Sequence, residues 1–147
     1  MTFHCRLLTP ERTLFEQEMA SLSLPTEMGD ITILPQHVAL TSVLAPGIAH
    51  FVDTMGHEHE LAVSNGFIEV VEGGAVTILA NTAERGDELD MHVIEEAKKR
   101  AEEVMRQAIG RDDVSFAAAA AGLRRELARE RLVMRHRARR QSSPESS

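Results

Sequence analysis

The fold class follows from the stretch IAHFVDTMGHEHELAVSNGFIEVVEGGAVTILA, which covers residues 48–80. Four runs rich in β-forming residues occur in it, at 48–53, 58–63, 67–71 and 75–80. The segments between these runs contain glycine, asparagine or paired glycines, which are residues that tight turns favour. Short runs separated by such turns are typical of antiparallel hairpins. The stretch therefore predicts a succession of short antiparallel strands.

The preceding residues extend this pattern toward the N-terminus. Further β-type runs occur at 3–8, 19–24, 31–34 and 38–44, and prolines and glycines mark the turns between them. So many short strands with closely spaced turns indicate an antiparallel sandwich or barrel. We expect this β-sandwich domain to occupy residues 1–86.

After Asn81 the apolar residues change to the spacing of a helix. Asp90 is a favourable helix cap, and the apolar positions behind it follow a helical period, namely Val93, Ala97, Ala101, Val104 and Ala108. A second apolar line begins after a short break, with Ser115 as its expected cap. The short break favours an antiparallel pair of helices.

The predicted fold class is therefore α+β with segregated halves. An N-terminal antiparallel β-sandwich is followed by a C-terminal antiparallel two-helix hairpin over residues 87–140. The remaining residues, 141–147, are polar and are expected to form a disordered tail.

The charge is distributed as unevenly as the secondary structure. Eight arginines and two glutamates between positions 124 and 140 give that segment a charge of +6. The whole chain carries −7, so residues 1–123 carry −12 once Glu145 is counted. An acidic body with a basic end points to an acidic partner for the basic end.

The cysteine count and the lengths of the apolar runs indicate the cellular compartment and the mode of membrane attachment. The single cysteine, Cys5, rules out an internal disulfide and a multi-cysteine metal site, and it favours a reducing compartment. No apolar run approaches the ~20 residues that a membrane-spanning helix needs, and the N-terminus lacks the apolar core of a signal peptide. We expect any membrane attachment to go through a partner protein.

Several segments follow one another in an informative order. They are GDITILPQHVAL at 29–40, LAPG at 44–47, VSNGFIEV at 63–70, VTILANTAER at 76–85 and EEAKKRAE at 95–102. Together they resemble the epsilon subunit of F-type ATP synthases, in a divergent bacterial branch. The resemblance implies a non-catalytic central-stalk subunit without a cofactor, peripheral at the cytoplasmic face of the bacterial inner membrane. It implies as partners the gamma subunit, the c-subunit ring, and the catalytic beta and alpha subunits.

The resemblance also assigns residues to these partners. It places Asp30 and His37 against the polar loops of the c ring. From spacing alone a structural role is favoured for both, Asp30 in the turn and His37 at a strand end. In the family the hairpin can fold down on the sandwich or rise into the catalytic head, where it brakes ATP hydrolysis. The resemblance therefore implies coupling of ion flow to ATP synthesis, with the brake in the hairpin.

The arginines of the second helix are the chemical basis for the brake. Forked guanidinium groups form charge-assisted hydrogen bonds with carboxylates, and the resemblance implies an acidic loop of the catalytic beta subunits as their target. A solvated helix face is the alternative. The residues concerned are Arg124, Arg125, Arg129, Arg131 and Arg135.

Some members of the family bind ATP on the folded hairpin, and the match to that site is partial. Asp90, Arg125 and Arg129 occupy family positions, but Val93 replaces an arginine. A phosphate site that lacks one of three cationic donors is weakened. We therefore expect no physiological ATP binding.

The sequence also leaves two alternative functions open, metal binding and nucleic-acid binding. His57 and His59 lie on one face of a strand, as in a cupin-like metal-binding β-barrel, and His4, His37 and His50 are possible further ligands. The spacing of the other cupin ligands is absent, so a solvated hairpin end is favoured. The arginine-rich end also suggests a nucleic-acid-binding arm. The acidic body without an aromatic platform for bases argues against nucleic acid as a partner.

Overall fold

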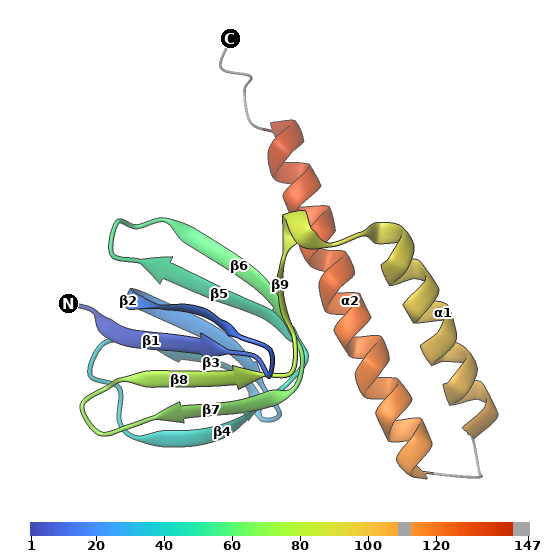
Figure 1. Ribbon diagram of the computed structural model, residues 1–147, viewed down its shortest axis with the longest axis horizontal. Coiled ribbons are helices and arrows are strands. Elements are labelled where there is room, and N and C mark those ends of the chain that lie inside the picture. The colour runs from blue at the N-terminus through green and yellow to red at the C-terminus, as the bar shows by residue number, and fades with distance from the viewer. Residues whose placement is uncertain (109–112, 143–147) are drawn as a thin grey trace.

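The computed structural model describes residues 1–108 and 113–142, and the side chains of 1–107 and 114–138. A β-sandwich forms the N-terminal part, and two helices pack side by side next to it (Figure 1). The predicted fold class, an antiparallel sandwich followed by an antiparallel helical hairpin, is confirmed.

The sandwich consists of nine strands that form two layers. Their order is β1-β8-β7-β4-β2-β5-β6-β9, with β3 beside β2. Strand β2 belongs to both layers, because it pairs with β1 in one and with β3 and β5 in the other. The bounds are β1 Phe3–Leu8, β2 Thr13–Thr26, β3 Gly29–Ile33, β4 Leu40–Leu44, β5 Gly47–Asp53, β6 Glu58–Val63, β7 Gly66–Val70, β8 Val76–Ala80 and β9 Ala83–Arg85.

Three features of the sandwich differ from the sequence-based expectation. Strands β1 and β8 pair in parallel, whereas the other pairs are antiparallel. The first half of β2 was not predicted, because residues 13–18 are mostly polar; there Glu16 lies opposite Arg6 of β1. The short strand β9 was missed because three residues give no period.

The core lies between the two layers and is built by alternating residues. In β8, for example, Val76, Ile78 and Ala80 are buried while Leu79 points outward. The buried ring of Phe51 meets the partly buried ring of Phe15 at the margin of this core, edge to face with centroids 5.0 Å apart. All members of this core cluster come from residues 3–83. The core of the sandwich is therefore complete without the helices.

The helices follow a short 3-10 turn, η1, at Gly86–Glu88. Helix α1 spans Met91–Ala108 and α2 spans Asp113–Ser142. Asp90 caps α1 as predicted, because its Oδ1 accepts a hydrogen bond from the backbone N–H of His92 at 2.8 Å. The predicted cap at Ser115 is wrong, since Ser115 lies within α2.

The expected tail at 141–147 falls largely outside the described residues. Residues 141 and 142 belong to α2, and residues 143–147 are not described.

Candidate functional site

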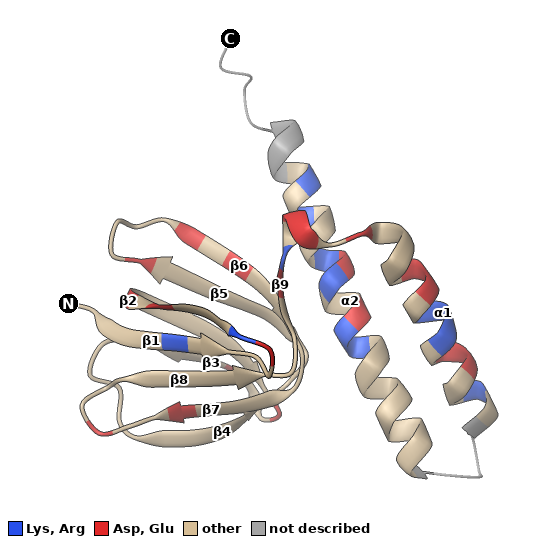
Figure 2. Ribbon diagram, in the orientation of Figure 1, with Lys and Arg blue, Asp and Glu red and all other residues tan. Residues whose placement is uncertain are grey.

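The face of α2 that meets the sandwich carries two ion pairs between the halves. Arg129 contacts Glu84 of β9, and Arg135 Nη1 donates to Glu60 Oε2 of β6 at 2.6 Å. Figure 2 shows the arginines gathered in the part of α2 nearest β9, whereas the other end of the helix is mostly uncharged. The basic half of α2 is thus the half that contacts the sandwich.

Glu126 holds one of these arginines in place. Arg129 Nη1 donates to Glu126 Oε1 at 2.7 Å, and Arg125 Nε lies 3.4 Å from the same oxygen. The Glu126 side chain is only 2% exposed. Within the described residues, Glu126 Oε2 and the Nε atoms of Arg125 and Arg129 are buried without a hydrogen-bond partner. The cluster is therefore charged, buried and incompletely satisfied.

Apolar packing between α2 and the sandwich is limited to a few side chains. Leu132 is buried, and a Cβ added at Gly86 would lie 3.5 Å from its Cγ and 3.2 Å from the Cβ of His136. A cavity of about 320 Å³ remains beside this contact, lined by Leu132, Phe15 and Leu61 among others. Helix α2 thus packs tightly against η1, and the space beside this contact is incompletely filled.

The five predicted brake arginines divide into two groups. Arg125, Arg129 and Arg135 are engaged by carboxylates, as described above. Arg124 and Arg131 are exposed, and no ion pair within the described residues involves either of them. Their role against the catalytic head stays a prediction.

The residues of the expected nucleotide group are occupied by other partners. The Asp90 carboxylate caps α1, and Arg125 and Arg129 face the carboxylates of Glu126 and Glu84. Carboxylates next to both arginines repel a phosphate group. The expectation that ATP binding is not physiological stays a prediction.

Asp30 and His37, the predicted c-ring contacts, lie at opposite ends of β3. Asp30 is near the start of the strand and lines a hollow of about 360 Å³ that Arg131 and Arg135 also line. His37 follows the end of the strand in a turn closed by its backbone N–H and the Leu34 carbonyl, 3.2 Å apart. The structure does not bring the two side chains together.

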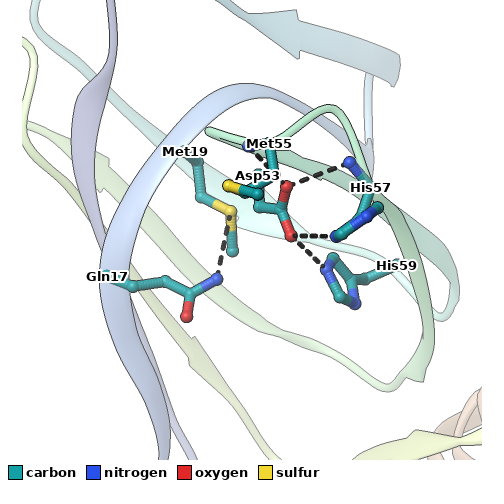
Figure 3. Close-up of polar contacts among 6 residues, drawn as sticks. All are labelled: Gln17, Met19, Asp53, Met55, His57 and His59. Atoms are coloured by element: carbon teal, nitrogen blue, oxygen red, sulfur yellow. Dashed lines mark hydrogen bonds and ion pairs between the residues drawn. The ribbon is translucent and has the colours of Figure 1, made fainter.

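His57 and His59, the candidate metal ligands, both turn toward Asp53 (Figure 3). Asp53 Oδ2 lies 2.9 Å from His59 Nε2 and 3.6 Å from His57 Nδ1. Asp53 Oδ1 accepts hydrogen bonds from the backbone N–H groups of Met55 and His57. The hydrogen bond from His59, with help from these N–H groups, lowers the pKa of Asp53 from 3.8 to about 2. The Asp53 carboxylate thus ties together the turn between β5 and β6.

Metal binding has no further support in this cluster. Within the part of the chain that the structure describes, no group of three or more His, Cys, Asp or Glu side chains is arranged to hold a metal ion.

An apolar row on the outer face of the sandwich was not predicted. Val43 of β4 lies opposite Phe67 of β7, which lies opposite Leu79 of β8. Their exposed fractions are 45%, 60% and 44%. The signal was present in the sequence, because all three sit at positions that the strand alternation directs outward. Only the register shows that they form one continuous row.

The described helices include none that combines the length and the hydropathy of a membrane span.

Comparison with known proteins gives matches over both parts of the chain. Residues 2–86 match the family model for the ATP synthase, Delta/Epsilon chain, beta-sandwich domain. A chain in the cryo-EM structure of the Euglena gracilis mitochondrial ATP synthase, with OSCP, F1 and c-ring, is 21% identical, with a TM-score of 0.75. That alignment covers 88% of this chain and 80% of the other.

A second similar structure comes from the central stalk and c-ring of the Tetrahymena thermophila mitochondrial ATP synthase. The matching chain is 12% identical with a TM-score of 0.58, over 90% of this chain and 97% of the other. At these identities the two structures show a shared fold.

Proposed function

Since the chain belongs to the family of ATP synthase delta and epsilon chains, we propose that it is a non-catalytic central-stalk subunit of an F-type ATP synthase. In this role the sandwich is part of the rotor, where it couples ion flow through the c ring to ATP synthesis. The helical hairpin leaves the sandwich to brake ATP hydrolysis in the catalytic head.

The observation that carries this proposal is the independence of the hairpin from the sandwich core. The core cluster draws only on residues 3–83, so the strands stay packed when the hairpin departs. Leu132 of α2 is buried in the contact that must break, and it lines an unfilled cavity there. A small interface that includes ion pairs is suited to reversible docking.

The exposed faces of the sandwich provide surfaces for the other rotor subunits. The row of Val43, Phe67 and Leu79 is apolar and continuous, and such rows are typical of protein interfaces. We assign it to the gamma subunit. The turn that contains His37 also exposes Leu34 and Val38, and we assign this end to the polar loops of the c ring. Asp30 stays a separate predicted contact with the c ring.

The membrane association in this proposal is peripheral, through the c ring and gamma. The cytoplasmic face of a bacterial inner membrane stays a prediction, which cell fractionation and immunoblotting with and without the other subunits would check.

An assembly experiment tests the braking function. Adding the full chain to its cognate catalytic head with gamma should slow ATP hydrolysis. A chain truncated before Val114 lacks α2 and should bind without slowing it. Equal effects of the two chains would contradict the brake, and failure of both to bind gamma would contradict the central-stalk assignment.

A charge variant refines this test without deleting a helix. Arg124 and Arg131 are exposed on α2, so Arg124→Glu with Arg131→Glu should weaken braking while the fold is retained. The matched control is Lys99→Glu with Arg100→Glu, which makes the same change on the exposed face of α1. If the control weakens braking as much as the α2 variant, the effect is one of net charge and the assigned arginines are wrong.

A further inference from the structure

Two carboxylates lie on the outer face of the sandwich beneath α2. In the β6–β9 register Ala62 is opposite Glu84, and Glu60 is two residues along β6, so the three side chains share one face. Ala62 is buried although it does not belong to the sandwich core cluster, and α2 contacts β6. Helix α2 therefore covers Ala62 and lies next to both glutamates. Figure 1 shows α2 beside the β9 side of the sandwich.

Each glutamate holds an arginine that the resemblance assigns to the brake. Arg129 contacts Glu84, and Arg135 contacts Glu60, whose side chain is 3% exposed. We propose that Glu60 and Glu84 form a latch that withholds Arg129 and Arg135 from the catalytic head. Docking on the sandwich and braking of the head then compete for the same two charges. This inference rests on the proposed braking function.

The latch is built so that it can open. Arg129 Nε and Glu126 Oε2 have no hydrogen-bond partner within the described residues, so the buried cluster recovers only part of what its desolvation costs. Arg135 remains 54% exposed despite its bond to Glu60, so its guanidinium is already partly solvated in the docked state. Exchange of a sandwich carboxylate for an acidic surface of the head replaces one charge-assisted hydrogen bond with another.

Competition for the same charges predicts opposite signs for changes on its two sides. Removing the charge of Glu84 releases the hairpin and leaves Arg129 available, so braking becomes stronger. Removing the charge of Arg129 also releases the hairpin, but it takes away a contact with the head, so braking becomes weaker. A purely structural ion pair would not separate these two variants.

A thiol placed under α2 reports the undocked fraction directly. Ala62→Cys puts the reporter where docking protects it, and the rate of its modification by a thiol reagent follows the population of the open state. The native Cys5 does not interfere, because it is fully buried and burial raises the pKa of its thiol to about 12.

In the full chain with this reporter, Glu84→Gln and Glu60→Gln should each raise the labelling rate about tenfold. Glu69→Gln is the matched control, because Glu69 is an exposed glutamate on β7, away from α2; it should leave the rate unchanged. The same glutamine variants without the reporter are then added to the cognate head with gamma. Glu84→Gln should inhibit ATP hydrolysis more strongly than the native chain. A further variant, Arg129→Gln, should inhibit it more weakly.

The outcomes separate the latch from the braking function. Unchanged labelling in both glutamate variants would overturn the latch. Faster labelling together with unchanged or weaker inhibition by Glu84→Gln, when the native chain does inhibit, would overturn the competition. If labelling responds as expected but the native chain does not slow hydrolysis, the latch contact stands and the proposed braking function fails.

Discussion

A methyl group added at Gly66 tests the register of the sandwich in its most crowded place. Gly66 begins β7 and lies between Leu44 of β4 and Ala80 of β8. A Cβ built on Gly66 would be 1.9 Å from the carbonyl oxygen of Leu79 and 3.0 Å from the Cα of Ala80. Both atoms belong to the backbone, so no side chain can turn aside to make room.

The size of the effect follows from this geometry. A carbon and an oxygen that are not bonded need more than about 3 Å between them, so Gly66→Ala must open the β7–β8 ladder by about 1 Å or more. Overpacking of this kind costs typically 1–3 kcal/mol, and because backbone must move we expect about 3 kcal/mol. For a domain of this size, this corresponds to a fall in Tm of about 10–20 °C.

The assay is urea and thermal unfolding followed by circular dichroism, with Gly122→Ala as the matched control. Gly122 lies inside α2 with nothing within 4 Å of an added Cβ, so the same change should stabilise that helix by about 1 kcal/mol. If Gly66→Ala unfolds within about 0.5 kcal/mol of the native chain, the β7–β8 register described here is wrong.

Three further predictions concern single groups of the sandwich. Hydrogen bonding lowers the pKa of Asp53 to about 2, so its contribution is present above pH 3.8 and is lost as the pH falls toward 2; Asp53→Asn should therefore flatten the loss of urea stability over that range, and an unchanged slope would contradict the His59 contact. Cys5, whose pKa burial raises to about 12, should react with a thiol reagent at pH 8 only after unfolding; rapid labelling of the native chain would be inconsistent with its position in β1. Gln36 has a φ of 67°, which costs a non-glycine residue about 1 kcal/mol, so Gln36→Gly should raise the urea midpoint, whereas a lowered midpoint would exclude that strain.

Local sequence patterns were sufficient to predict features that depend on a single helix or strand. The period-two runs located the strands except the polar first half of β2 and the three-residue β9, because both depend on pairing rather than on their own residues. The cap at Asp90 was predictable because a cap acts within one turn. The cap at Ser115 was wrong because α2 begins two residues earlier.

The candidate sites were predictable as residue types and not as contacts. The excess of arginine near the C-terminus indicated an acidic partner, and in the structure two of these arginines meet acidic residues of the chain itself, Glu60 and Glu84. His57 and His59 were expected on one face of a strand, but His57 lies in the turn before β6. Asp53, the carboxylate that both contact, was not anticipated. Asp30 and His37 were paired by resemblance and lie at opposite ends of β3.

The sequence by itself determined the class of each element, the boundary between the β and α halves, and the charge difference between them. These properties depend on residues close together in the chain, whose periods and turns express themselves locally. Only the tertiary structure decided that Val43, Phe67 and Leu79 form a row and that Arg129 meets Glu84, 45 positions away. Such contacts depend on strand register and helix docking, and both are set by how the whole chain buries its apolar surface at once.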